Sequence, residues 1–358
     1  MIKDFLKKHH IRSKRFAIGV SGGADSLALA LMFKEAYPQY HLTALTVDHQ
    51  LRPSSRQEAE YVSQIMQQYG IEHHILTWQG QKPQTGIEEA AREARYYLLC
   101  EWCQQHQISY LAIAHHLFDQ AETFLMRLQR GSGLFGLSAI QDISMMNGIS
   151  IIRPLLYTHP DLLKDYLRQK NLSWVEDESN QCTDFLRVKM RHFLPLLKEK
   201  AGISAERLCE TVQQLQKTRS FIEDLVQQTI NSAVHFWSES GCSLDYTAFI
   251  NFHDEMKFYI LRQLLLTISR DNYAPEAEAI ETLIKNLKKT DFSSATLGHV
   301  HIQRSDLRIW FIREMRRKDK DLSETQWQHY CAQNPSVRGV KIPHKLRLAL
   351  FYEKNTKK

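Results

Sequence analysis

The first half of the chain alternates short apolar runs with longer segments in which apolar residues recur at helical spacing. The apolar runs predict buried strands at Phe16–Val20, His41–Asp48, Glu72–Trp78, Ser109–His115 and Ile149–Arg153. The helical segments lie between them, at residues 27–32 and beyond, 55–69, 86–105 and 119–129. Strands that alternate with helices are typical of βαβ units. The pattern therefore predicts an α/β fold, with a parallel sheet covered by helices on both faces.

The second half of the chain has a different pattern. After Pro160 it is mostly helical to about residue 236, and further helices are expected at residues 254–268 and 275–288. Short strands of a meander are expected at residues 294–297, 300–303 and 307–312. We expect a first domain over 1–210, a smaller, mostly helical domain with the meander over 211–315, and a C-terminal extension over 316–358.

Charge is distributed unevenly along the 358 residues, whose formal net charge is +6. Residues 304–358 hold 14 Lys and Arg against 6 Asp and Glu, so this end is strongly basic. A basic block is either a solvated tail or a surface for a polyanion such as RNA. No apolar run approaches the roughly 20 residues that span a bilayer. The N-terminus lacks the apolar region of a signal peptide, so we expect a cytoplasmic protein without a membrane partner.

The cysteines do not form a recognisable metal-binding pattern. They are Cys100, Cys103, Cys182, Cys209, Cys242 and Cys331. Only Cys100 and Cys103 have ligand spacing, and they fall inside a predicted helix with no second pair to complete a zinc site. We expect all six thiols to be reduced and structural.

The turn after the first predicted strand carries the strongest chemical signal. It reads Ser21-Gly22-Gly23-Ala24-Asp25-Ser26 and leads into a helix. Glycines let the backbone approach a ligand closely, and the start of a helix favours an anion such as phosphate. No Walker A lysine is present. Asp25 would repel a bare phosphate, so we expect Mg²⁺ to bridge the two, unless Asp25 and Ser26 simply cap the helix.

Two other strand ends bring polar residues to the same edge of the predicted sheet, where ligands bind in such folds. Asp48 and His49 follow the second strand and could face the base or ribose of ATP, or Asp48 could cap the turn. His115 and His116 follow the fourth strand.

Charged residues at helical spacing follow these strand ends. His116, Asp119 and Glu122 recur every three residues at a helix start, which fits either a functional site or acidic residues that stabilise the helix dipole. Arg92 and Arg95 share a helix face and could clamp phosphate, although a surface network with glutamates explains them equally simply.

Three further sets of residues could bind substrate. Arg127 precedes a glycine-containing loop, and Asp177 and Asn180 belong to an acidic, polar loop at residues 174–180. Arg187 and Arg191 lie four residues apart on the next predicted helix. Carboxylates beside a cationic helix suggest one site for an ammonium group and another for a phosphate.

The SGGADS turn resembles the pyrophosphate loop of the N-type ATP pyrophosphatases, and the chain as a whole resembles one branch of them, the tRNA(Ile)-lysidine synthetases. The matching runs follow the family order: SGGADS at 21–26, VDHQLR at 47–52, EEAAREARY at 88–96, AHHLFDQAETFLMRLQRGSGLFGL at 114–137, RPLL at 153–156, WVEDESN at 174–180 and RVKMRHFLPLL at 187–197. Val188 stands where the family usually has asparagine. Many members also carry a further C-terminal domain, and we expect residues 316–358 to stand in its place.

The resemblance implies a ligase with ATP and Mg²⁺. The wobble cytidine of the isoleucine tRNA with a CAU anticodon would be adenylated, and free L-lysine would then displace AMP to give lysidine. A homodimer is a further expectation. Residues 211–315 would bind tRNA.

The resemblance also implies roles for particular residues. Asp25, Asp119, Glu122 and Arg95 would be catalytic, with Asp25 also the metal ligand. ATP would be bound by Ser21, Gly22, Gly23, Ala24, Asp25, Ser26, Asp48 and His49. Substrate would be bound by Arg92, His116, Arg127, Asp177, Asn180, Arg187 and Arg191.

Two other functions share the loop. A related tRNA-modifying ATPase could thiolate cytidine, for which reactive cysteines near the loop are expected. A nucleotide- and RNA-binding module would need no catalysis, and the paired carboxylates argue against it.

Overall fold

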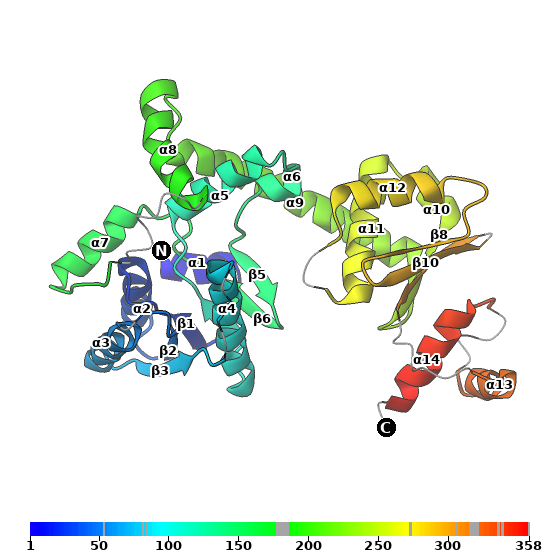
Figure 1. Ribbon diagram of the computed structural model, residues 1–358, viewed down its shortest axis with the longest axis horizontal. Helices are drawn as coiled ribbons and strands as arrows, with labels where there is room; N and C mark the ends of the chain where they lie inside the picture. The colour runs from blue at the N-terminus through cyan, green and yellow to red at the C-terminus, as the bar shows by residue number, and fades with distance from the viewer. Residues whose placement is uncertain are drawn as a thin grey trace. The chain divides into compact units, whose positions relative to one another are not determined.

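The computed structural model describes most of the chain. The described residues are 1–52, 54–80, 82–83, 85–176, 186–271, 274–305, 307–314, 322–334, 337 and 340–356. They form two compact units, Met1–Arg219 and Ser220–Lys358, which are coloured blue to green and green to red in Figure 1. Within the described ranges, no helix is long and apolar enough to cross a membrane.

The first unit is built on a six-stranded sheet in the order β3-β2-β1-β4-β6-β5. The strands are β1 (Arg15–Gly19), β2 (His41–Asp48), β3 (Glu72–Thr77), β4 (Tyr110–Ala112), β5 (Ile143–Met146) and β6 (Ile149–Ile152). All neighbours are parallel except β5 and β6, which are antiparallel. Because β1 is central, the loop that follows it lies between the ends of β2 and β4.

Helices cover both faces of this sheet. Helices α2 (Ala24–Ala36) and α3 (Ser55–Gln68) pack on one face, and α4 (Ile87–Gln105) packs on the other. The unit also contains α1 (Ile2–Lys8), α5 (Leu117–Gln129), α6 (Leu134–Leu137), α7 (Pro160–Gln169), α8 (Leu186–Ala201) and α9 (Ala205–Ala233), the last of which continues into the second unit. Side chains of β1 alternate between two cores: Phe16 and Ile18 pack with α2, and Ala17 packs with α4. The predicted α/β class with covered faces is confirmed.

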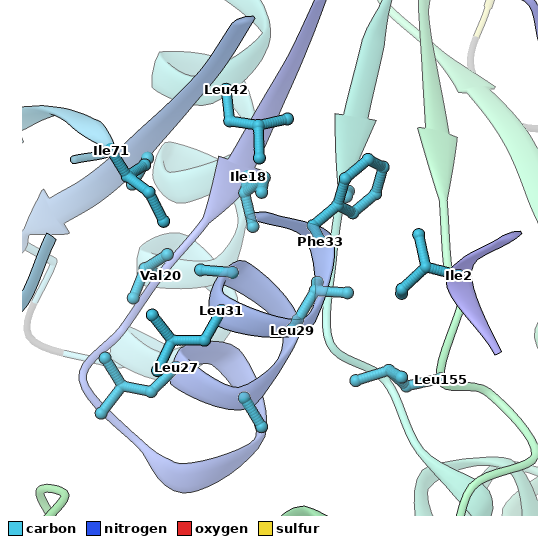
Figure 2. Packing of buried hydrophobic residues seen from close by; sticks show 14 of the residues in the cluster. Ile2, Ile18, Val20, Leu27, Leu29, Leu31, Phe33, Leu42, Ile71 and Leu155 are labelled. Carbon is cyan, nitrogen blue, oxygen red and sulfur yellow. The ribbon is translucent and has the colours of Figure 1, made fainter. Parts of the chain in front are cut away.

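Helix α2 is buried on almost every side, which explains its nearly continuous apolar sequence. Its residues Leu27 to Leu31 are all inaccessible to solvent, because the sheet covers one side and α7 packs on another. Figure 2 shows Leu27, Leu31 and Phe33 of α2 in this core, with Ile2 and Leu155 also in it. The start of α2, which carries the SGGADS turn, is therefore held rigidly.

The second unit has an antiparallel sheet in the order β7-β8-β11-β10-β9. Its elements are β7 (Val234–Ser238), β8 (Gly241–Asp245), α10 (Tyr246–Asn251), α11 (Asp254–Ser269), α12 (Ala277–Leu287), β9 (Ser294–Leu297), β10 (Val300–Ser305), β11 (Arg308–Arg313), α13 (Glu324–Gln333) and α14 (His344–Thr356). Ile309 and Phe311 of β11 face a core with α11 and α12, whereas Trp310 and Ile312 face α13 and α14.

The expected meander and the two helices before it are present, but the sequence reading omitted three strands. These are β5, β7 and β8, and the helix expected to run to about residue 236 ends at Ala233, where β7 begins. The chain divides after Arg219. The functions expected of the individual domains stay predictions.

Candidate nucleotide site

The loop Ser21–Ser26 connects the central strand β1 to α2. Gly22 has a φ of +88°, and a Cβ there would lie 3.2 Å from Cγ2 of Val62 and 3.4 Å from Cγ2 of Val175. The amide of Val175 donates a hydrogen bond of 3.0 Å to the carbonyl of Gly22. Glycine is thus needed at position 22 for both the backbone conformation and the close approach of neighbours.

Ser26 ties the two ends of this loop together. Its hydroxyl donates to the Gly23 carbonyl at 3.0 Å and accepts from the Ser21 amide at 3.1 Å. Gly23 is the N-cap of α2 and has no side chain with which to bind the first amides of the helix. Those amides have no carbonyl partner within the helix, so the loop presents preordered donors that suit a phosphate group.

Asp25 lies in the first turn of α2 and is about a third exposed, at 33%. Its Oδ1 atom is buried and has no hydrogen-bond partner among the residues that the structure describes. Its Oδ2 atom lies 3.6 Å from Nε2 of His116. Burial raises the pKa of Asp25, and the charge of Asp119 raises it further. A buried, unpaired carboxylate oxygen is suited to a metal ion, which would restore the ionised form.

His116 and Asp119 cap the start of α5. The Asp119 carboxylate accepts from the His116 amide at 2.9 Å, and Nδ1 of His116 accepts from the Phe118 amide at 3.2 Å. The ring proton of His116 is therefore assigned to Nε2, which lies 3.5 Å from Asp119 and faces both carboxylates. The expected alternative, a simple helix cap, is thus present, but the same residues also join Asp119 to Asp25.

Burial by itself would raise the pKa of Asp119. Neighbouring His116 and the positive charge of Arg187 outweigh burial and lower this pKa to about 2. Arg187 donates to Asp119 Oδ1 at 3.0 Å. Asp119 therefore stays ionised at every physiological pH, which makes it a strong partner for a cation and a weak base.

Glu122 is completely buried, at 0% exposed, and joins two arginines of α8 to α5. Its Oε2 accepts from Nε of Arg187 and its Oε1 accepts from Nε of Arg191, both at 2.8 Å. Both carboxylate oxygens are thus engaged with guanidinium groups. The prediction that Glu122 handles the lysine proton stays a prediction, and its contacts favour a role in orienting the arginines.

Helix α4 contributes a second group of cations. Arg95 is partly buried and Arg92 is exposed. Burial lowers the pKa of Arg95, as do the nearby positive charges of Arg92 and Arg187. Guanidinium groups that are close enough to repel one another favour a bound anion.

Two residues at the end of β2, Asp48 and His49, also belong to the candidate site. Asp48 is buried, and its Oδ1 accepts from the Gln50 amide at 2.9 Å and from the Ser55 hydroxyl at 2.8 Å, so it caps the turn. Nδ1 of His49 is buried and has no hydrogen-bond partner in the described part of the chain. Burial and the charge of Arg95 lower the pKa of His49, so this ring is neutral and can bind a ligand.

Sequence reasoning gave no role to Arg153, which follows β6 and is buried. Its Nε donates to Nδ1 of His115 at 3.1 Å, and its Nη1 donates to the Gln141 carbonyl and the Ser144 hydroxyl. Burial lowers the pKa of His115 to about 3. The sequence could have indicated Arg153 as a site residue, because both Arg153 and His115 follow the carboxyl ends of parallel strands.

The structure brings together most, but not all, of the predicted site residues. Asp25, His116, Asp119, Glu122, Arg187 and Arg191 form one chain of contacts. Arg127 is exposed near the end of α5, eight residues from Asp119 and hence about 12 Å along the helix axis. Asp177 and Asn180 lie outside the described residues. Val188, in place of the family asparagine, is buried.

Comparison with known proteins agrees with this geometry. Residues 1–197 match the family model described as PP-loop domain. A tRNA(Ile)-lysidine synthase from Wolbachia pipientis wMel is 32% identical over 92% of this chain and 79% of its own length. The synthase from Zymomonas mobilis is 34% identical over 77% of this chain and 82% of its own.

Among solved structures, the U34-tRNA thiolase NcsA from Methanococcus maripaludis, with its [4Fe-4S] cluster, is similar in fold. Its TM-score is 0.51 with 19% identity, and the match covers 60% of this chain and 80% of the thiolase. This likeness supports the fold alone. The family match over residues 1–197 and the relatives over most of the chain show that this protein belongs to the tRNA(Ile)-lysidine synthase family of PP-loop proteins.

Proposed function

We propose that the protein uses ATP to ligate lysine to C2 of the wobble cytidine in the isoleucine tRNA with a CAU anticodon. The cytidine is first adenylated with release of pyrophosphate, and lysine then displaces AMP. The observation that carries this proposal is the single chain of contacts from the phosphate-binding loop through Asp25, His116 and Asp119 to Arg187. Family membership supports it independently.

The loop and Asp25 act on the leaving pyrophosphate. The amides at the start of α2 donate to phosphate oxygens, and Gly22 lets the backbone come close. Asp25 would hold Mg²⁺ through its unpaired Oδ1, since Mg²⁺ in such sites takes one or two carboxylates together with phosphate oxygens. When bound, Mg²⁺ neutralises charge on the phosphates.

Arginines stabilise the charge that develops on the α-phosphoryl group. Arg95 and Arg187 are two partly buried cations of the site, and Arg187 is fixed by Asp119 and Glu122. Preordered donors of this kind lower the barrier because they need not reorganise during the reaction. We propose that Glu122 is a positioning residue that acts through Arg187 and Arg191.

Lysine presents a separate difficulty, because its ammonium group must lose a proton before it can attack. With a reference pKa of about 10.4, deprotonation at pH 7 costs roughly 4–5 kcal/mol. We propose that Asp119 binds the ammonium, for which its low pKa suits it, and that His116, whose Nε2–H faces Asp119, holds this carboxylate in place.

The second unit is proposed to bind tRNA, together with Arg92, Arg127, Asp177 and Asn180 of the first unit. Its support is the basic segment 304–358, which should attract the RNA backbone and give salt-dependent binding. Location in the cytoplasm and a homodimer stay predictions.

Thiolation is the weaker candidate. Burial raises the pKa of Cys100 to about 11 and that of Cys103 to about 12, so neither forms a reactive thiolate at neutral pH. Among the described residues, no group of three or more His, Cys, Asp or Glu is placed to hold a metal ion by protein ligands alone.

Mass spectrometry of tRNA incubated with ATP and lysine tests the proposal. We expect one lysyl group on the wobble cytidine, with AMP and pyrophosphate as products. Incorporation of sulfur, or ADP with unmodified RNA, would contradict it.

The Asp25→Ala variant examines the metal-binding role. It should abolish pyrophosphate release and leave tRNA binding largely intact. The control is Asp165→Ala, which removes an exposed carboxylate of α7 that pairs only with nearby Arg168 in the described structure. Undiminished pyrophosphate release by Asp25→Ala would overturn the role of Asp25.

A further inference from the structure

Tyr96 of α4 carries a buried hydroxyl group whose hydrogen bonds the described residues satisfy only in part. The side chain is only 5% exposed, and its ring packs in the core between α4 and the sheet with Ala17, Leu45 and Leu111. Its hydroxyl oxygen is buried and faces the guanidinium of Arg153, which can only donate to it, so the hydroxyl proton has no acceptor among the described residues. Because a buried donor without an acceptor is costly, a ligand that accepts this hydrogen bond is its simplest explanation.

Cations surround this tyrosine. The guanidinium carbons of Arg92 and Arg95 lie 5.2 and 5.5 Å from the centre of the Tyr96 ring. Arg153 and Arg187 also lie close enough to interact electrostatically with Tyr96. The hydroxyl therefore belongs to the same cationic region as Arg95 and Arg187.

Apart from the carboxylates of Asp119 and Glu122, which are already paired with Arg187, the groups considered around Tyr96 are hydrogen-bond donors. Nδ1 of His115 accepts from Arg153, so the ring proton of His115 is on Nε2, which is a donor. The guanidinium groups can only donate, and the Tyr96 hydroxyl is also a donor. The ligand that matches a set of donors is an anion rich in oxygen, such as a phosphoryl group.

We propose that Tyr96 is a substrate-contacting residue whose hydroxyl donates a hydrogen bond to a nonbridging oxygen of the α-phosphoryl group of the nucleotide. This inference rests on the proposed function and adds to it a phosphate contact from the middle of α4. The hydroxyl would orient the phosphoryl group through a directional hydrogen bond, and the arginines would supply positive charge.

The Tyr96→Phe variant removes the hydroxyl and retains the ring. A matched control is Tyr166→Phe in α7, since the Tyr166 hydroxyl is also buried but faces Glu35, a carboxylate. Both full-length variants should melt no lower than the parent protein. Calorimetry with a non-hydrolysable ATP analogue and Mg²⁺ should show about 10- to 100-fold weaker binding by Tyr96→Phe alone.

Release of pyrophosphate under saturating tRNA should fall by a similar factor in Tyr96→Phe. Unchanged nucleotide affinity and turnover in this variant would overturn the inference. A loss confined to tRNA affinity would also overturn it, because the contact would then lie on RNA. Absence of AMP and pyrophosphate with the parent protein would instead refute the proposed function, so the two failures are distinguishable.

Discussion

Replacement of Glu122 by Gln tests whether one buried carboxylate holds the site together. Glu122 is fully buried and accepts one hydrogen bond of 2.8 Å from each of Arg187 and Arg191. Glutamine has the same shape but only one oxygen, so one arginine would face an amide NH₂ group that cannot accept. The substitution therefore removes a charge-assisted hydrogen bond with little change in volume.

The size of the effect follows from the burial of the partners. A hydrogen bond to a charged group contributes about 1.5–3 kcal/mol, and removing one partner of a fully buried ion pair costs about 3–5 kcal/mol. Arg187 and Arg191 are 35% and 36% exposed, so water compensates in part. We expect a loss of about 2 kcal/mol, which corresponds to roughly 4–8 °C in the melting temperature of a unit of this size.

The measurement pairs thermal unfolding with lysidine formation. Glu122→Gln should melt roughly 4–8 °C lower and lose about 10- to 100-fold in turnover, because Arg187 is no longer fixed. Asp165→Asn is the matched control: its ion pair with Arg168 is exposed on both sides, and its effect should stay below about 0.5 kcal/mol. A Glu122→Gln protein that melts and turns over like the parent would refute the positioning role.

Two further predictions concern the loop and the strands beneath it. Gly22→Ala should lower the free energy of unfolding by about 1–2 kcal/mol, because φ at this position is +88°, and it should also weaken nucleotide binding. Gly70→Ala is the control: Gly70 has a φ of +62° and open space around it, so this variant should show the effect of backbone strain alone. Equal nucleotide affinity in both variants would contradict this. His73 lies between Thr46 and Ser63, and burial lowers its pKa to about 4. Stability should therefore fall by up to about 3 kcal/mol as the pH drops from about 6.5 to 4, and His73→Gln should lose this part of a urea-denaturation pH profile.

Local patterns predicted most of the first sheet. The runs around Ile18 and Leu45 are apolar because both faces of a parallel strand are covered, and such runs are easily recognised. Strand β5 has only four residues at an antiparallel edge and has no comparable signal. Strands β7 and β8 form a hairpin around Ser240. Because the neighbouring His235 and Phe236 are both exposed, β7 lacks the alternation of buried and exposed residues by which a strand is recognised.

The candidate site was predicted as a set of residue types at strand ends. The topology rule that gathers carboxyl ends at one edge was sufficient for Asp25, His116 and Asp119. It did not reveal which residues pair. Arg187 and Glu122 are 65 positions apart, and Arg153 and His115 are 38 apart. Residues so far apart in the chain leave no local sequence pattern from which either pairing could be predicted.

The sequence by itself determined the class of fold, the phosphate-binding turn and the family, because backbone preferences and motif spacing are local properties. Tertiary structure alone decided that Glu122 is buried beneath two arginines, that Arg153 directs His115, and that the proton of the Tyr96 hydroxyl has no acceptor among the described residues. Burial and hydrogen-bond pairing depend on which distant segments pack together. They set the charge, pKa and orientation of each group, and through these its chemistry.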